Sequence, residues 1–228
     1  MRAGPAAVAV LLAGGLTVSS AGLAGCGLGP RETVSRQYQV EEPVTGVLIT
    51  GATVDVTVKP GDGPVTVVER LRWPGGRAAP RTAHRTVAGR LELSSTGCRR
   101  CQVTLTVTVP AATSTEIHID TGDLTLRDLS GDVSAAVSTG DVTGSGLRGA
   151  TYRLVVDTGR VELRHATTPT DVVATVDTGE VEVRVPGGAS YAVHSDRGLS
   201  SVDVARDPAS PYTITVNVDT GHAVVHRI

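Results

Sequence analysis

Four copies of the tripeptide Asp-Thr-Gly are the residues in this sequence whose type and spacing most readily suggest chemistry. The copies begin at Asp120, Asp157, Asp177 and Asp219. Aspartic proteases hold two carboxylates close enough to share one proton, and in them each Asp-Thr-Gly is normally followed by Ser or Thr. In this chain the four glycines are followed by Asp, Arg, Glu and His. We therefore predict no catalytic residues, and interpret each copy as a turn whose aspartate bonds the following backbone.

Metal binding is the second chemistry that the acidic residues could support. Calcium takes six to eight oxygen ligands, and the best candidate cluster is Asp120 with Asp123 and Asp141. His222 and His226 are four residue steps apart, which on a strand spans about 13 Å and is too far for one ion. A solvated acidic edge that opposes strand-to-strand aggregation explains the aspartates better. We therefore expect neither a metal site nor a cofactor.

The composition narrows the classes of partner. Aromatic residues make up 2% of the 228 residues, with no Phe and one Trp, so stacking platforms for sugars or single-stranded nucleic acids are mostly missing. The formal net charge of -2 argues against a bulk nucleic-acid binder. Hydrophobic residues, at 40%, are numerous enough to bury a core, which excludes a disordered chain. We expect no nucleic-acid partner.

Charge is distributed unevenly along the chain. Residues 70–100 carry eight Arg against one Glu, a net of +7, whereas residues 111–228 carry nine Arg against 16 Asp and Glu, a net of -7. Each positive charge near an anionic membrane contributes roughly 1 kcal/mol of attraction. One hypothesis is that the segment Arg70–Arg100 contacts anionic lipid headgroups or envelope polymers. The interpretation we favour from the sequence alone is an ordinary solvated loop.

The N-terminus has the features of an export signal. Arg2 provides a basic start, Ala6–Val18 is an apolar run, and small residues lead to the tetrapeptide L-A-G-C at Leu23–Cys26. This tetrapeptide resembles the bacterial lipobox in all four positions. The resemblance implies cleavage before Cys26, a diacylglyceryl group on its sulfur, and a location on the extracytoplasmic face of the cell membrane. An uncleaved transmembrane anchor is the alternative, although many glycines and serines dilute the apolar run.

Two further cysteines, Cys98 and Cys101, form the motif C-R-R-C. Outside the cytoplasm a local disulfide is the expected outcome. A redox-active pair would normally open a helix, whereas a strand-like segment follows here. A zinc site would need two more ligands at suitable spacing. We predict a disulfide between Cys98 and Cys101.

A recurring phrase organises the rest of the chain. Ile119–Leu126 (IDTGDLTL) and Val176–Val183 (VDTGEVEV) are two of its copies. The spacings between its glycines are 18, 19, 20, 19 and 23 residues, and these glycines are Gly122, Gly140, Gly159, Gly179, Gly198 and Gly221. A period near 19 is too short for helical repeats and is typical of strand-based ones. The alternation V-E-V-R at Val181–Arg184 places apolar side chains on one face of a strand.

These features predict an all-β fold with two possible architectures. In a β-solenoid each unit of about 19 residues forms one rung and identical turns stack; in an antiparallel β-meander or sandwich the turns alternate between two edges. The near-constant unit length favours the solenoid. We predict a signal peptide over 1–25, a flexible tether over 26–37, an N-terminal β region over 38–110, and a repetitive β-solenoid over 111–228 that continues it. Pro74–Arg85 is expected to be a long loop.

Over residues 38–228 the chain resembles the bacterial putative-adhesin domain family. The similarity lies in a strand set ending in V-T-V-P at Val107–Pro110 and in the ladder of [DS]-T-G-[DRE]-[LV] turns, preceded by a lipobox. The resemblance implies a β-helical domain of an exported protein whose activity is uncharacterised. The chain departs from the pattern where the turn has become D-R-G at Asp196–Gly198.

Three functional hypotheses follow. The first is a non-catalytic lipoprotein module that binds or scaffolds at the cell envelope, with an envelope polymer or protein as partner. The second is a polysaccharide-active enzyme, which would need clustered carboxylates beside sugar platforms; from residue 117 onward the aromatic residues are Tyr152, Tyr191 and Tyr212. The third is a regulatory sensor of envelope stress. We expect the first, and no enzyme.

Overall fold

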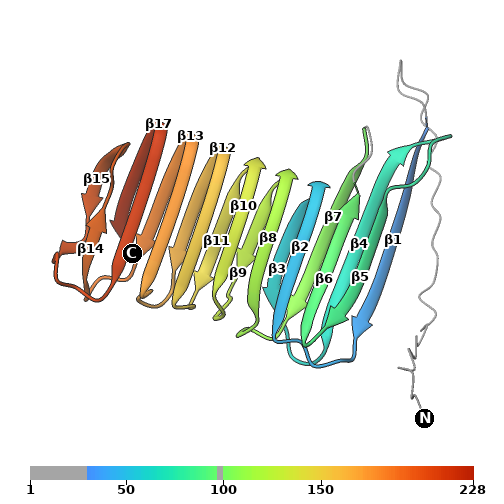
Figure 1. The fold of residues 1–228 in the computed structure, drawn as a ribbon, viewed down its shortest axis with the longest axis horizontal. Helices are drawn as coiled ribbons and strands as arrows, with labels where there is room; N and C mark the ends of the chain where they lie inside the picture. Colours follow the sequence, from blue (N-terminus) through green and yellow to red (C-terminus); the bar gives the residue numbers. More distant parts are fainter. Residues whose placement is uncertain (1–29, 97–99) are drawn as a thin grey trace, which may run out of the picture.

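The computed structural model describes residues 30–96 and 100–228. In this part of the chain, seventeen strands form one mixed sheet that curls around an apolar core as a half-barrel (Figure 1). No helix within these two ranges has the length and apolarity needed to cross a bilayer.

The strands follow one another along the whole described chain. Their bounds are β1 (Arg31–Val40), β2 (Gly46–Thr53), β3 (Asp55–Pro60), β4 (Val65–Pro74), β5 (Arg81–Val87), β6 (Arg90–Thr96), β7 (Gln102–Val109), β8 (Ser114–Thr121), β9 (Leu124–Arg127), β10 (Val133–Thr139), β11 (Val142–Leu147), β12 (Thr151–His165), β13 (Asp171–Val185), β14 (Ser190–His194), β15 (Leu199–Asp203), β16 (Ala205–Arg206) and β17 (Thr213–Arg227).

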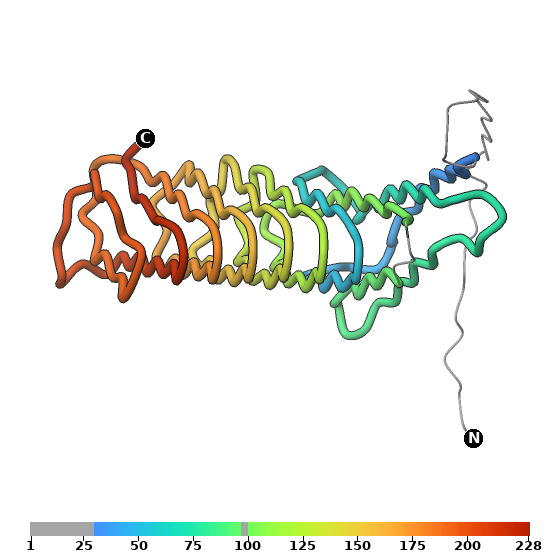
Figure 2. The backbone as a smooth tube through the Cα atoms, turned by 90° about the horizontal axis from the view of Figure 1, so that it is seen from above, coloured from blue at the N-terminus to red at the C-terminus, as the bar shows by residue number. Residues whose placement is uncertain are grey.

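The sheet has two arms that face each other across the core (Figure 2). The first arm contains β6, β2, β8 and β10, and the second contains β7, β3, β9 and β11. Each of β12, β13 and β17 has 15 residues and runs through both arms, with its first half in one and its second half in the other. Alternate residues of each strand point into the space between the arms, as the buried Val103, Leu105, Val107 and Val109 of β7 do. The core is therefore thin and mostly aliphatic, and it also buries Trp73, Tyr152 and Tyr191.

From β8 onward, neighbouring strands within each arm are parallel and in register. Val137 of β10 lies opposite Ile119 of β8 on one side and opposite Val156 of β12 on the other. Inward positions thus stack on the same inward positions of the next strand, except at register shifts between Gly144 and Leu147 and between Leu199 and Ser201, and the stacks bury apolar columns. The regular spacing of the apolar residues in the sequence is the cause of this register.

The arms meet at a bend formed by a column of glycines. Gly122, Gly140, Gly159, Gly179 and Gly221 all have positive φ, between 135° and 148°. A Cβ on Gly140 would overlap the carbonyl oxygen of Gly122, and a Cβ on Gly159 would overlap that of Gly140. Only glycine therefore allows consecutive bends to stack this closely.

The N-terminal part of the sheet is built differently. Strand β1 pairs antiparallel with β4, β4 pairs antiparallel with β7, and β5 pairs antiparallel with β6. Strands β1 and β5 are the outermost strands of the two arms at this end of the molecule (Figure 1). Because these neighbouring strands run in opposite directions, loops and strand ends of residues 30–109 lie at both edges of the sheet.

The prediction of a β-solenoid with one rung per unit of about 19 residues is wrong. The sheet is mixed, and sequence neighbours are not always sheet neighbours, because β8 pairs with β2 and β10, and β17 lies between β13 and the pair β14 and β15. Copies of one repeated phrase present similar faces, so position in the sequence does not decide which two copies pair. The antiparallel β-meander or sandwich, which was the alternative, fits the structure better than the solenoid does. The antiparallel pairs are found among β1, β4, β5, β6 and β7.

Two predicted boundaries also need correction. Strand β1 begins at Arg31, so the range 26–37 predicted as a flexible tether contains the start of the sheet. The segment Pro74–Arg85, predicted as a long loop, contains the first residues of β5. Both segments are rich in exposed polar residues because they form edge strands, and this polarity hides the period-2 pattern of a strand.

Candidate functional site

A groove of about 430 Å3 lies on the outer face of the first arm. Arg90, Ser114 and Thr151, which line it, are the first residues of β6, β8 and β12. Parallel strands in register begin at the same edge of the sheet, so polar residues from loops far apart in the sequence meet there. The polar residues that line the groove are Thr45, Arg90, Ser114, Thr115, Glu116, Asp132, Ser134, Thr151 and Arg153.

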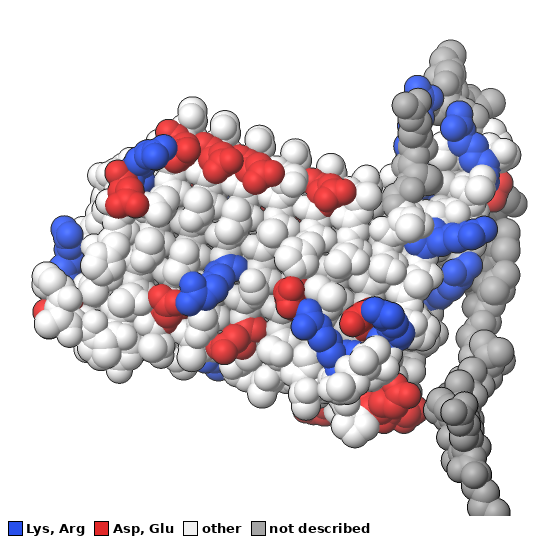
Figure 3. Space-filling model, viewed as in Figure 1, with Lys and Arg blue, Asp and Glu red and all other residues white. Residues whose placement is uncertain are grey.

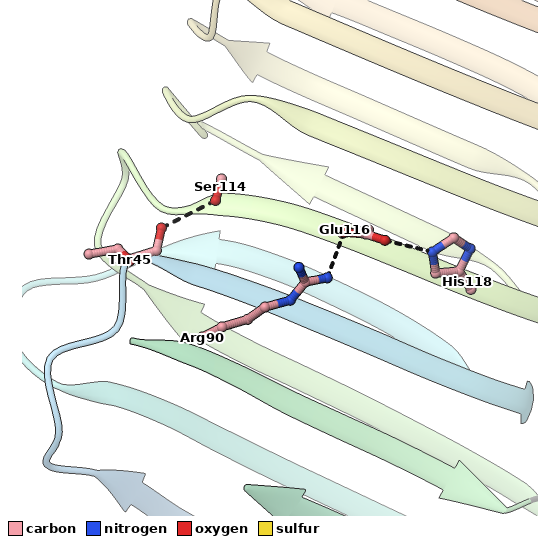
Figure 4. A network of polar contacts seen from close by, with 5 residues as sticks. All are labelled: Thr45, Arg90, Ser114, Glu116 and His118. Carbon is pink, nitrogen blue, oxygen red and sulfur yellow. Dashed lines mark hydrogen bonds and ion pairs between the residues drawn. The ribbon is translucent and has the colours of Figure 1, made fainter. Parts of the chain in front are cut away.

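Arg90 and Glu116, which line the groove, belong to a chain of three charged or ionisable side chains that continues to His118 (Figure 4). Arg90 Nη2 donates to Glu116 Oε2 at 2.6 Å, and Glu116 Oε1 lies 3.0 Å from His118 Nε2. Arg90 is on β6 and Glu116 is on β8, with β2 between them. Gly46 of β2 lies directly between Arg90 and Ser114 in the register, and a Cβ on Gly46 would lie 3.0 Å from the Ser114 hydroxyl oxygen.

Glu116 is held as a carboxylate. The hydrogen bond with His118, and then that from Arg90, lower the pKa of Glu116 below its usual value. The side chains of Arg90 and Glu116 are 43% and 42% exposed, and ion pairs this open to water typically contribute less than about 1 kcal/mol to stability. The contacts therefore fix the positions of charges more than they stabilise the fold.

Hydrogen bonds join the loops around the groove to one another. Ser114 donates to the carbonyl of Thr45 through both its backbone N–H and its hydroxyl, at 3.1 and 3.3 Å. The backbone N–H of Thr151 donates to Asp132 Oδ1 at 3.0 Å. At the far end of the groove, Arg153 donates to Asp171 at 3.0 Å. These hydrogen bonds hold the strand starts, and with them the polar side chains of the groove, in fixed positions relative to one another.

The arrangement suits recognition of a polar partner. Two guanidinium groups at opposite ends, with carboxylates and hydroxyls between them, offer both donors and acceptors to a ligand. Glu116 is a poor general acid because its pKa is lowered. The Ser114 hydroxyl donates to a backbone carbonyl, and no base activates it among the described contacts. We see no nucleophile or acid–base pair in the groove.

The aspartates of the Asp-Thr-Gly copies lie elsewhere, at the bend between the arms. Asp120, Asp157, Asp177 and Asp219 are all exposed, and acidic groups form a row along the upper edge of the molecule (Figure 3). Within the described part of the chain, these side chains do not form the predicted hydrogen bonds to the following backbone. Asp219 instead contacts Arg197 at 3.0 Å. The recurring glycines, Gly122, Gly140, Gly159, Gly179 and Gly221, lie in the bend as described above.

A different set of aspartates ties the bends together. Asp55 Oδ1 accepts from the N–H of Asp123 at 3.2 Å, and Asp123 Oδ1 accepts from that of Asp141 at 3.0 Å. Asp141 Oδ1 in turn accepts from the N–H of Arg160 at 2.8 Å. Each carboxylate therefore reaches from one strand to the next. Sequence reasoning missed this role, although the aspartate directly after the glycine in two copies of the phrase, at Asp123 and Asp141, was a visible signal.

The candidate calcium cluster, Asp120 with Asp123 and Asp141, is not brought together as one metal site in the described part of the chain. Within residues 30–96 and 100–228, no group of three or more His, Cys, Asp or Glu side chains converges as metal ligands would. Asp123 and Asp141 are engaged with backbone N–H groups. His222 lies 3.8 Å from Glu180, on the neighbouring strand.

The cysteines are only partly within the described chain. Cys101 is disulfide-bonded. Cys98, its predicted partner, and Cys26, the predicted lipidation site, lie outside the described residues. Lipidation and the Cys98–Cys101 pairing therefore stay predictions.

The groove itself could not be found from the sequence. Arg90 and Glu116 are 26 residues apart and meet only because β2 lies between β6 and β8. No local pattern signals that arrangement. A second cluster was missed for the same reason: the buried Glu69 accepts from Tyr38 at 3.1 Å and from Thr82 at 2.6 Å.

Comparison with solved structures supports the fold. A crystal structure described as a putative cell adhesion protein from Clostridium sporogenes superimposes with a TM-score of 0.50 at 11% sequence identity, covering 86% of this chain and 99% of that one. A putative adhesin from Bacteroides fragilis gives a TM-score of 0.48 at 16% identity, covering 86% and 97%. No protein-family model matches the sequence, and no curated protein matches it significantly. The chain has a putative-adhesin-like fold, and at this identity the likeness concerns the fold alone.

Proposed function

We propose that this protein is a non-catalytic binding module, anchored by lipid at Cys26 to the extracytoplasmic face of the cell membrane, whose groove at Arg90 and Glu116 binds a polar partner of the cell envelope. The observation that carries the proposal is the groove, where charged and hydroxyl side chains from several strand starts are fixed beside one another. An envelope polymer or an envelope protein has the polar chemistry that such a surface suits.

Two further observations support a binding role. The structure from Clostridium sporogenes that shares the fold is described as a putative cell adhesion protein. In addition, the groove is open to solvent along the outer face of the sheet and is lined by hydroxyl side chains, such as those of Ser134 and Thr151. An open polar groove suits an extended partner better than a small substrate that must be enclosed.

The lipid anchor is supported by the sequence. The L-A-G-C tetrapeptide at Leu23–Cys26 follows an apolar run with a basic start. Mass spectrometry of the protein from membranes of the producing bacterium tests the anchor: we expect a mature chain that begins at a diacylglyceryl-modified Cys26. A chain that retains an unmodified Met1 would contradict it.

The binding role is tested separately from the anchor. The full chain with Cys26→Ser is mixed with insoluble cell-wall polysaccharide of the same bacterium, and its depletion from solution is measured by co-sedimentation. We expect binding that the double variant R90Q/E116Q weakens about tenfold or more. The matched control is E162Q/R184Q, which removes another exposed ion pair of 2.7 Å on the outer face of the second arm.

Two results would contradict this proposal. Equal binding by the two double variants would show that the groove is not the site. Release of soluble sugars from the polysaccharide by the purified protein would overturn the non-catalytic role.

A further inference from the structure

Six exposed arginines gather at one corner of the molecule, which we call the basic corner. They are Arg31, Arg70, Arg72, Arg77, Arg81 and Arg100. Arg31 begins β1 opposite Pro74 of β4, so the start of β1 and the end of β4 lie side by side. The chain then passes through Arg77 to Arg81, the first residue of β5. Figure 3 shows Lys and Arg gathered at this end of the molecule.

The charges of the basic corner are not neutralised within the described chain. None of its six arginines forms an ion pair there, whereas the nearby Arg85 and Arg90 pair with Glu92 and Glu116. Glu32 also lies at this corner, where it accepts from the backbone N–H of Gly76 at 3.4 Å, so six exposed arginines face one exposed carboxylate. A concentrated positive field therefore faces solvent at this corner.

The basic corner lies close in the sequence to the proposed lipid anchor, which favours this corner as the part of the protein that faces the membrane. Arg31 is five residue steps from Cys26, and five steps of extended chain span at most about 18 Å. An anchor in the bilayer would keep this corner near the headgroups, and electrostatic attraction to a charged surface extends over about 8 Å at physiological salt. The opposite end of the molecule, at β14 and β15, lies far along the long axis (Figure 1).

We propose that the basic corner rests on an anionic lipid surface and orients the protein with its groove exposed away from the bilayer. The proposal deepens the proposed function, because it uses the anchor at Cys26 to bring the corner to the membrane. The structure sharpens the sequence-based hypothesis for Arg70–Arg100. It removes the paired Arg85 and Arg90 from the contact surface and adds Arg31 of β1.

The test uses the full chain with Cys26→Ser, so that the result does not depend on acylation. Co-sedimentation is measured with phosphatidylcholine vesicles that contain or lack phosphatidylglycerol, at low and high salt. We expect binding only to the anionic vesicles, and weaker binding at high salt. The triple variant R70Q/R72Q/R77Q should bind on the order of 100-fold less tightly, or about fivefold per charge.

The matched control is the triple variant R127Q/R164Q/R206Q. It removes the same charge from three exposed arginines that have no ion pair within the described chain and lie outside the basic corner. It should bind the anionic vesicles within about twofold of the parent chain. Circular dichroism confirms that both triple variants are folded.

Three results would overturn the proposal. One is equal binding to vesicles with and without phosphatidylglycerol. Another is an equal loss of binding in the two triple variants. The third is tight binding of soluble polyphosphate without binding to anionic vesicles, which would identify a polyanion site that is not a lipid contact. If Cys26 proves unmodified in cells while anionic vesicles still bind at the corner, only the anchor is lost.

Discussion

The side chain of Asp123 accepts a hydrogen bond from the backbone N–H of Asp141 at 3.0 Å, linking two neighbouring bends of the sheet. The same bond recurs from Asp141 to the N–H of Arg160 at 2.8 Å. The bends carry glycines with positive φ. Without the aspartate side chains, the backbone N–H groups of Asp141 and Arg160 at these bends would depend on water as their hydrogen-bond acceptor. The acidic edge of the molecule is thus partly a structural device and not only a solvated surface.

The first prediction concerns this ladder. Replacing Asp141 with Ala removes the acceptor for Arg160 N–H, and we expect the free energy of unfolding to fall by about 1 kcal/mol. Urea denaturation measures the loss. The control is Asp120→Ala, because the Asp120 side chain is exposed and forms no hydrogen bond among the described residues. This change should alter the free energy of unfolding by less than about 0.5 kcal/mol. Equal losses in the two variants would contradict the ladder's role.

The second prediction concerns the glycine bend. In Gly159→Ala, the added Cβ would overlap the Gly140 carbonyl oxygen, and φ would have to stay at 148°. We expect a loss of at least about 3 kcal/mol in unfolding free energy, or no soluble protein. Gly187→Ala is the control, because a Cβ there meets nothing within 4 Å. Thermal melting that leaves both variants equally stable would show that the bend can relax.

The third prediction concerns pH. His165 is fully buried, and its ring lies edge-on to that of Tyr152, with 4.7 Å between the ring centroids. Neither of its ring nitrogens has a hydrogen-bond partner among the described residues. Burial lowers the pKa of His165 from 6.5 to about 4. The unfolded chain therefore binds a proton below about pH 6.5 and the folded chain only near pH 4, so stability falls as pH drops through this window.

Between pH 7 and pH 4.5 this difference in proton binding amounts to about 2 kcal/mol. His165→Leu should abolish that part of the pH dependence in urea denaturation at the two pH values. His194→Gln, at an exposed position, should leave it intact. A His165→Leu variant that loses as much stability on acidification as the parent would place the pH dependence elsewhere.

The fourth prediction concerns the buried carboxylate near the N-terminal end. Glu69 accepts from Tyr38 and Thr82, which belong to the outermost strands of the two arms. Burial, and then the charge of Glu69, raise the pKa of Tyr38. Tyr38→Phe should lower unfolding free energy by about 1 to 2 kcal/mol.

A double-mutant cycle sharpens the fourth prediction. Thr82→Val with Tyr38→Phe should show non-additive losses, since both hydroxyls serve one carboxylate. Tyr212→Phe is the control, because its hydroxyl has no hydrogen bond among the described residues. Additive losses in the cycle would mean that Glu69 does not couple the two edge strands.

Local features of this fold could be predicted from the sequence. Alternation such as that of Val181–Arg184 identified strands, and the recurring Gly140 and Gly159 identified the bends, because both effects act within a few residues. Partner choice could not be predicted. Val137 must lie between apolar residues, but Ile119 and Val156 satisfy this no better than other copies of the phrase would. The mixed sheet and the place of β17 therefore came only from the structure.

The candidate groove illustrates the same limit. Arg90 and Glu116 are separated by β7 in the sequence, and the strand that lies between them in the sheet is β2. Their ion pair depends on the pairing of β6 and β8 with β2, which no local pattern in the sequence signals. The Asp-Thr-Gly aspartates, in contrast, were conspicuous in the sequence and prove to be exposed and mostly unbonded.

The place of β17 between β13 and the pair β14 and β15 has a consequence for the order in which the sheet can assemble. As the chain emerges, β14, β15 and β16 appear before the strand on which two of them pair. Until β17 emerges, the outer edge of β13 must remain unpaired. β17 then inserts between β13 and the strands β14 and β15, which have already been made. For a protein that crosses a membrane N-terminus first, this end of the sheet would be completed only after Thr213–Arg227 has been delivered.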